Sequence, residues 1–146
     1  MASIMAGDQD YAGDVTVAEV WNQLSTNSDA QLIDVRTQPE WSFVGVPDLG
    51  KLGKRPVFVS WQMYPDMSVN PRFAEELRAQ GIKPGQPLYF LCRSGARSRA
   101  AAKAMTAAGF TACYNVAGGF EGDLDAEKHR SRLGGWKATG LAWTQS

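Results

Sequence analysis

The sequence predicts an α/β fold in which a parallel sheet carries helices on both faces. Short apolar runs typical of buried strands alternate along the chain with segments whose apolar residues recur every three or four positions, as in helices. Strands that alternate with helices in this way form parallel sheets, which need helical cover on both faces. The chain has 146 residues, of which 44% are hydrophobic, and this is enough for the core of a single domain.

The first half of the chain contains one clear helix and two strands. Residues 1–13 are small and polar without periodicity, so we expect a flexible N-terminal arm and a single domain over residues 14–146. A capping box that begins at Thr16 predicts the first helix. Residues 31–36 and 56–61 are predicted to be buried strands, and a loop rich in glycine and proline joins them.

The second half continues the alternation of helices and strands. Asn and Pro at residues 70–71 predict the start of a helix, and residues 87–91 form the most apolar strand. The following helix carries small alanines on its apolar face, which allow close packing on a sheet, and it stops at Gly109. Residues 111–116 predict a further strand, and a polar helix is expected over residues 120–132.

The charge balance, the cysteine count and the length of the apolar runs exclude several classes of protein. The 15 basic and 15 acidic side chains cancel, so no overall field would attract nucleic acid or an anionic membrane. Cys92 and Cys113 are too few for a disulfide scaffold, and the N-terminus lacks a secretory signal. No apolar stretch reaches the length of a membrane helix. We therefore expect a cytoplasmic protein with free thiols and with neither a nucleic-acid nor a membrane partner.

Residues 92–98 (CRSGARS) join the most apolar strand to the alanine-rich helix, at the sheet edge where ligands of parallel folds bind. A short strand-to-helix loop directs backbone N–H groups into one concavity, and the helix N-terminus adds a partial positive charge. These groups would stabilise a Cys92 thiolate, which is a nucleophile, and Gly95 permits the tight turn. The arginines of the loop would hold an anionic substrate. The candidate substrate-binding residues are Arg93, Ser94, Gly95, Ala96, Arg97 and Ser98.

The competing interpretation is that Cys92 is a small buried hydrophobic residue with solvated arginines beside it. The combination of cysteine, glycine and two arginines between a strong strand and a strong helix favours a functional site instead. Cys113 precedes a strand in an apolar setting, and we expect it to be a buried structural thiol. His129 is the only histidine and lies among charged residues, so we expect it to face solvent and predict no histidine-rich metal site.

The cysteine loop and several supporting motifs resemble the rhodanese family of sulfurtransferases. The resemblance covers about residues 15–143 and is most specific in residues 92–98. The supporting motifs are LIDVR followed by PEW within residues 32–41, NVAGGF at 115–120, and GWK through GLAW at 135–143. The resemblance implies a central parallel sheet of five strands.

The resemblance also implies a reaction in two steps. A small anionic donor such as thiosulfate gives its sulfane sulfur to the Cys92 thiolate, and the loop amides hold the resulting persulfide. An acceptor such as cyanide or a thiol, which a thioredoxin-like or biosynthetic protein could provide, then takes the sulfur. This chemistry needs neither a metal nor a cofactor. A second hypothesis is a persulfide carrier module that serves a partner enzyme, and the sequence does not separate the two.

Loop length bears on a further alternative, because related phosphatases and arsenate reductases share the fold that the resemblance implies. Those enzymes surround a tetrahedral oxyanion with a loop one residue longer. Only four residues lie between Cys92 and Arg97 here. The narrower loop favours a terminal sulfur over a phosphoryl group.

Asp34 and Arg36 are candidate supporting residues beside the loop. An Asp at a strand end more often anchors neighbouring loops through backbone N–H groups than it contacts substrate, and Arg36 is a plausible partner for Glu40. Arg97 has two open roles: it faces the substrate, or it pairs with an acid such as Asp34 and holds the loop closed.

Residues 48–55 form an insertion relative to the family pattern. The insertion either shapes substrate access or is a surface excursion, and we slightly favour the second. Trp61 and Trp136 are the aromatic candidates for walls of a pocket.

Overall fold

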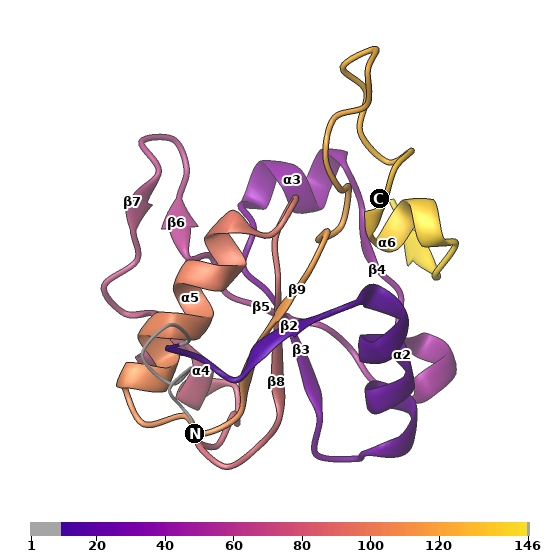
Figure 1. Ribbon diagram of the computed structural model, residues 1–146. Helices are drawn as coiled ribbons and strands as arrows, with labels where there is room; N and C mark the ends of the chain where they lie inside the picture. The colour runs from indigo at the N-terminus through magenta and orange to yellow at the C-terminus, as the bar shows by residue number, and fades with distance from the viewer. Residues whose placement is uncertain (1–9, 146) are drawn as a thin grey trace.

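The computed structural model describes residues 10–145 (Figure 1). Its centre is a parallel sheet of five strands in the order β2, β9, β8, β3, β5. The strands are β2 (Gly13–Val15), β3 (Gln31–Asp34), β5 (Val57–Phe58), β8 (Leu88–Leu91) and β9 (Cys113–Val116). The predicted α/β architecture is therefore confirmed, although the strands are shorter than the apolar runs that predicted them.

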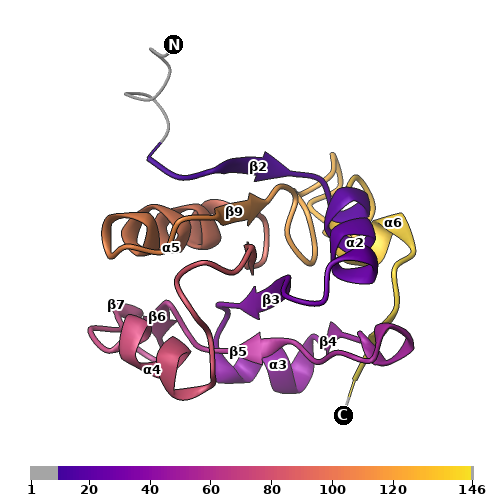
Figure 2. The same cartoon turned by 90° about the horizontal axis from the view of Figure 1, so that it is seen from below.

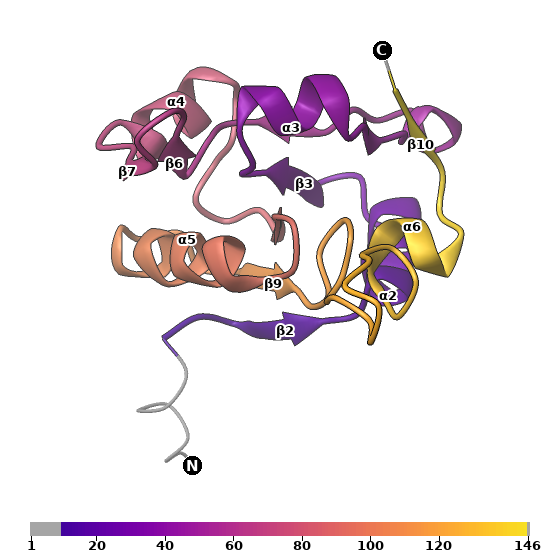
Figure 3. The same ribbon diagram turned by 90° about the horizontal axis from the view of Figure 1, so that it is seen from above.

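Helices cover both faces of this sheet (Figure 2). On one face lie α2 (Val17–Thr26) and α6 (Gly135–Thr139), and on the other lie α4 (Phe73–Ala79) and α5 (Ala96–Ala107). A fifth helix, α3 (Gln38–Phe43), follows β3. Figures 1 and 3 place α3 and the segment between β9 and α6 at the same end of the sheet.

The central strand β8 shows why its segment is apolar along its whole length. Leu88 and Phe90 pack with α4 and α5, whereas Tyr89 and Leu91 pack with α2 and α6. A strand that is buried on both faces needs apolar side chains at every position. The strand therefore leads directly from the core to the residue that follows it, Cys92.

Several short elements were not predicted from the sequence patterns. A hairpin of β6 (Gln62–Met63) and β7 (Ser68–Val69) follows β5. Near the C-terminus, β10 (Trp143–Thr144) pairs antiparallel with β4 (Val46–Pro47), and a 3₁₀ turn, η1 (Gly50–Leu52), follows β4. Strands of two residues carry too little periodicity to be recognised in a sequence.

The insertion at residues 48–55 packs beside the C-terminal end of α2. Leu49 is buried in the core, and Lys54 Nζ donates to the carbonyl oxygens of Asn27 (2.7 Å) and Ala30 (2.6 Å). A lysine in this position satisfies carbonyl groups at the end of the helix. Among the described residues that line the pocket beside Cys92, none belongs to the insertion.

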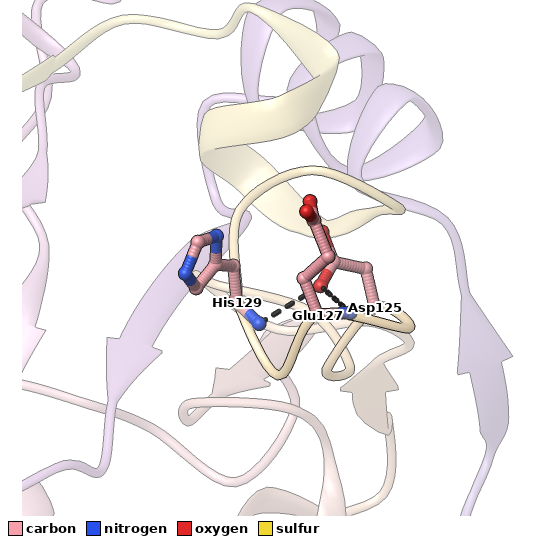
Figure 4. Close-up of side chains that lie close together, drawn as sticks. All are labelled: Asp125, Glu127 and His129. Atoms are coloured by element: carbon pink, nitrogen blue, oxygen red, sulfur yellow. Dashed lines mark hydrogen bonds between the residues drawn. The ribbon is translucent and has the colours of Figure 1, made fainter.

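The polar helix expected over residues 120–132 is wrong, because this segment is an irregular loop (Figure 4). Asp125 Oδ1 accepts hydrogen bonds from the backbone N–H groups of Glu127 and His129, both at 2.9 Å. A short acidic side chain that binds nearby backbone amides competes with helical hydrogen bonding. In addition, Ser131 has a φ of 68°, which lies outside the helical range.

The sheet begins within the last residues of the expected N-terminal arm. Of the expected arm at residues 1–13, residues 1–9 lie outside the described part of the chain. Ala12 donates its backbone N–H to the carbonyl oxygen of Cys113 at 2.8 Å, and Gly13 begins β2, so the sheet starts before residue 14. Within residues 10–145 we find no helix with the length and apolar character needed to cross a membrane.

Candidate active site

Cys92 lies directly beyond the carboxyl end of β8 and before the N-terminus of α5. Its Sγ accepts hydrogen bonds from the backbone N–H of Gly95 and from Ser98 Oγ, both at 3.2 Å. Gly95 has a φ of 124°, which residues with a side chain rarely adopt. The first-turn amides of a helix lack intrahelical acceptors and mark the positive end of its dipole. This arrangement surrounds the sulfur with groups that stabilise negative charge.

The turn after β9 holds the cysteine loop in place. The backbone N–H groups of Phe120 and Glu121 donate to the carbonyl oxygens of Cys92 (2.8 Å) and Arg93 (2.9 Å). Gly119 is needed for this contact, because a Cβ there would lie 2.5 Å from the Cys92 carbonyl oxygen. With its first two carbonyl groups bound from this turn, the loop is held with the Gly95 amide directed at the sulfur.

A chain of polar side chains connects buried Cys92 to the exposed Asp14 at the edge of the sheet. Ser98 Oγ lies 2.5 Å from Asn115 Oδ1, and Asn115 Nδ2 donates to Asp14 Oδ1 at 2.9 Å. Ser98 and Asn115 are fully buried. Because Ser98 has one hydroxyl proton, Asn115 Oδ1, Cys92 Sγ and the carbonyl oxygen of Gly95 (3.3 Å) compete for it. The sequence patterns identified Ser98 as a hydrogen-bonding residue but missed Asn115 and Asp14.

Arg97 pairs with Glu40 rather than with Asp34. Its guanidinium donates to both carboxylate oxygens of Glu40, at 2.7 and 2.8 Å, and the two side chains are 16% and 19% exposed. Burial alone would raise the pKa of Glu40, but the hydrogen bonds and charge of Arg97, with hydrogen bonds from Thr37, lower it to about 2. Arg97 therefore ties the start of α5 to α3, while part of it still lines the pocket.

Asp34 and Arg36 form a fully buried ion pair, so the expected pairing of Arg36 with Glu40 is wrong. Arg36 Nη2 donates to Asp34 Oδ2 and to the carbonyl oxygen of Gly45, both at 2.8 Å. The guanidinium also lies 4.3 Å from the centre of the Phe120 ring. Asp34 accepts a hydrogen bond from the backbone N–H of Arg36, which agrees with the expected role of Asp34 in anchoring the neighbouring loop. Both residues support the turn that holds the cysteine loop and do not line the pocket.

A pocket of about 550 Å³ opens beside Cys92. Of the predicted site residues, the structure places Cys92, Arg93, Ser94, Ala96 and Arg97 in its lining. The other lining residues are Glu40 and Val44, Gln62 and Met67, and Glu121 and Arg130. They come from the α3 segment, from the β6–β7 hairpin and from the loop after β9. The sequence patterns missed the last four because the hairpin was not predicted and the loop was assigned to a helix.

The two tryptophans considered as pocket walls lie elsewhere. Trp61 packs edge-on against Phe73 at a ring-centroid distance of 5.3 Å, and Trp136 packs against Trp21 at 5.9 Å. Trp136 is fully buried. Both therefore serve the two core layers and not the pocket.

The loop after β9 also brings Asp125, Glu127 and His129 together, with potential ligand atoms within 4.8 Å of one another (Figure 4). Arg132 Nη1 lies 3.4 Å from Asp125 Oδ2 and 2.9 Å from Glu127 Oε1. Both carboxylates thus have Arg132 as a cationic partner already. Asp125 also accepts hydrogen bonds from two backbone amides. His129 is exposed, as expected.

The sequence profile of a family described as the STR4 middle domain matches residues 12–146. The chain belongs to the STR4 middle-domain family. Its similarity to the crystal structure of Rv0390 from M. tuberculosis extends over 93% of this chain and 99% of that one, with 51% identity and a TM-score of 0.86. The "Uncharacterized protein RC0915" of Rickettsia conorii is 37% identical over 125 residues, which are 86% of this chain and 91% of that protein.

More distant similarities connect this STR4 middle-domain protein with rhodanese-like proteins. The chloroplastic rhodanese-like domain-containing protein 4 of Arabidopsis thaliana is 26% identical over 126 residues, covering 86% of this chain and 24% of that protein. The solution structure of the polysulfide-sulfur transferase homodimer from Wolinella succinogenes matches with a TM-score of 0.61 at 22% identity, over 94% of this chain and 80% of that one. The rhodanese resemblance is thereby confirmed at the level of the fold.

Proposed function

We propose that this protein is a sulfurtransferase that carries a sulfane sulfur as a persulfide on Cys92. The observation that carries the proposal is the environment of Cys92 Sγ, which accepts hydrogen bonds from the Gly95 amide and Ser98 hydroxyl beside an open pocket. Such an environment stabilises a thiolate, and the pocket gives a substrate a route to the sulfur, as nucleophilic catalysis by cysteine requires.

With thiosulfate as donor, the Cys92 thiolate attacks the outer sulfur. The sulfur–sulfur bond of thiosulfate breaks, and sulfite leaves with the electron pair of that bond. A cyanide ion or a thiolate then attacks the outer sulfur of the Cys92 persulfide, and the Cys92 thiolate leaves. The negative charge remains near the same sulfur atoms in both steps. A single set of hydrogen-bond donors in the cysteine loop can therefore stabilise it in both.

Arg93 is the proposed anchor for the anionic part of the donor. No carboxylate lies within ion-pair distance of Arg93 anywhere in residues 10–145, whereas the charge of Arg97 is compensated by Glu40. An exposed guanidinium without a partner is available to bind an oxyanion. We assign Arg97 mainly to holding the loop, with Gly95 and Ser98 directed at the transferred sulfur.

A persulfide carrier that serves a partner enzyme is the second candidate. Tyr64 is 64% exposed on the hairpin that also contributes Met67 to the pocket, and Phe43 is 79% exposed next to the pocket residue Val44. Exposed apolar groups around a site favour contact with another protein. We therefore include a protein-borne thiol, on a thioredoxin-like or biosynthetic protein, among the proposed acceptors, and we propose the cytoplasm, where thiols stay reduced, as the compartment.

The test compares wild type with Cys92→Ser and Cys113→Ser. We expect wild type and Cys113→Ser to form thiocyanate from thiosulfate and cyanide and to gain about 32 Da on Cys92 with donor alone, as a persulfide requires. Cys92→Ser should do neither. If Cys92 gains sulfur only from a donor protein and no thiocyanate forms, the carrier function replaces the thiosulfate activity. If the wild type hydrolyses an aryl phosphate faster than it transfers sulfur, the proposal is wrong and a phosphatase takes its place.

A further inference from the structure

Arg130 lines the pocket but has no part in the mechanism above. It belongs to the loop between β9 and α6, which Figure 1 shows rising beyond the end of the sheet. Arg130 Nη1 donates to the carbonyl oxygen of Gly122 at 2.7 Å, and the backbone N–H of Gly122 donates to the carbonyl oxygen of Arg93 at 3.2 Å. The Arg130 guanidinium is therefore attached to the same turn that holds the cysteine loop.

The charged groups of the pocket are not equivalent. Arg97 and Glu40 compensate each other through two short hydrogen bonds. By contrast, no ion pair within residues 10–145 includes Arg93, Arg130 or Glu121. The pocket thus has two arginines and one carboxylate outside any ion pair of the described residues, and Lys137 interacts electrostatically with that carboxylate. This excess favours a ligand with net negative charge that is long enough to contact both arginines.

The size and lining of the pocket indicate a ligand with an organic body. Its volume of about 550 Å³ lies within the range of about 300–1,000 Å³ that is usual for pockets binding organic molecules. Thiosulfate would occupy only a small part of this space. Val44 and Met67 add apolar surface to the walls, and methionine adapts readily to the shape of a ligand.

We propose that Arg130 binds a carboxylate of the sulfur donor, and that the site takes an organic sulfane-sulfur anion in preference to thiosulfate. This inference rests on the proposed sulfur transfer. The Cys92 thiolate attacks the outer sulfur, the sulfur–sulfur bond of the donor breaks, and the organic fragment leaves with the electron pair as a sulfinate or thiolate. Arg93 binds the anionic group next to the sulfur, Arg130 binds the distant carboxylate, and the organic body contacts Met67 and Val44.

The test uses two stable donors that differ in a single group, benzenethiosulfonate and its 4-carboxylate. In wild type we expect kcat/KM for the carboxylated donor to exceed that for the plain donor by about 10- to 100-fold, the range for one charged hydrogen-bonded contact. Arg130→Met should remove this preference, whereas any decrease that comes from losing its hydrogen bond to the Gly122 carbonyl oxygen should be shared by both donors. Arg132→Met is the matched control, because Arg132 lies in the same loop but outside the pocket, and it should keep the preference.

Three outcomes are decisive. Loss of the preference in Arg130→Met alone supports the inference. An equal decrease for both donors would overturn it, because Arg130 would then act only by holding Gly122 and the cysteine loop. If neither donor adds sulfur to Cys92, the proposed function fails. Binding of 4-sulfinobenzoate to Cys92→Ser, measured by calorimetry with and without Arg130→Met, then still decides whether Arg130 binds a carboxylate.

Discussion

The two cysteines occupy opposite ends of the same helix and are equally hidden from solvent. Cys92 precedes the N-terminus of α5, whereas Cys113 begins β9 after the C-terminus of α5. Their exposed fractions are 1% and 0%, so burial does not distinguish them. The two sites differ instead in the direction of their hydrogen bonds and in their access to a pocket.

At Cys92 the sulfur is an acceptor, whereas at Cys113 it is a donor. Cys92 Sγ accepts from Gly95 and Ser98 and lines the pocket. Cys113 Sγ donates to the carbonyl oxygen of Phe110 at 3.6 Å, and burial raises the pKa of the Cys113 thiol to about 11. An environment of donors stabilises a thiolate, and an environment of apolar groups and acceptors stabilises a thiol. One helix therefore separates the proposed reactive cysteine from a cysteine that packs in the core.

The largest expected difference between the two sites is in alkylation of the folded protein. At about pH 8, only about one Cys113 in a thousand is a thiolate if its pKa is about 11, and its position in the core adds a further barrier. We expect iodoacetamide to modify Cys92 at least about 100-fold faster than Cys113. Peptide mass spectrometry after timed quenching measures both rates in one sample. In denaturant the rates should become similar, and similar rates in the folded protein would contradict the comparison.

A smaller effect on the alkylation rate should follow when one of the two hydrogen-bond donors to Cys92 Sγ is removed. Ser98→Ala deletes the hydroxyl that lies 3.2 Å from Cys92 Sγ and leaves the Gly95 amide in place. One hydrogen bond to a charged group contributes about 1.5–3 kcal/mol, so we expect alkylation of Cys92 at neutral pH to slow by roughly 10-fold.

The rate at Cys113, measured in the same Ser98→Ala sample, is the internal control and should not change. Unchanged alkylation of Cys92 would mean that the Ser98 proton belongs to Asn115 in the resting protein. Replacement of Asn115 by leucine, which removes the competing acceptor at 2.5 Å, would then be the informative variant.

The cysteine loop could be predicted from sequence because its signals are local. Cys92, Gly95 and the arginines lie within one short segment between a strand and a helix that both have strong patterns. The assignment of Cys113 to the core likewise needed only its apolar neighbours. Close packing of α5, with Ala101 and Ala102 fully buried, follows from the alanines themselves.

The partners of these residues could not be predicted because they are distant in sequence. Arg97 and Glu40 are 57 positions apart, and Asn115 and Asp14 are 101 positions apart. Choosing Glu40 as the partner of Arg97 requires knowing that α3 lies beside the start of α5. Arg36 is a different case, because its partner Asp34 is only two positions away but Glu40 is also near it in sequence. The error at residues 120–132 has a local cause, because a polar sequence pattern does not reveal that Asp125 binds nearby backbone amides instead of continuing a helix. That error concealed Arg130 and Glu121 as pocket residues.

A third expected difference concerns the stability of the packing site at high pH. Because the pKa of Cys113 is raised from 9.0 to about 11 in the folded protein, the unfolded chain loses this proton first. The stability from the neutral thiol is complete below about pH 9 and is lost as the pH rises toward 11. We expect the free energy of unfolding of wild type, relative to Cys113→Ser, to fall by about 2 kcal/mol between about pH 8 and about pH 10.5.

Urea titrations of both proteins at each pH measure this difference, and the subtraction removes the titration of lysines and tyrosines that the two proteins share. The variant Cys92→Ser is the matched control, because it also replaces one buried thiol. If the difference between wild type and Cys113→Ser stays constant over this range, Cys113 is not held as a neutral thiol. The contrast between the two ends of α5 would then rest on access to the pocket alone.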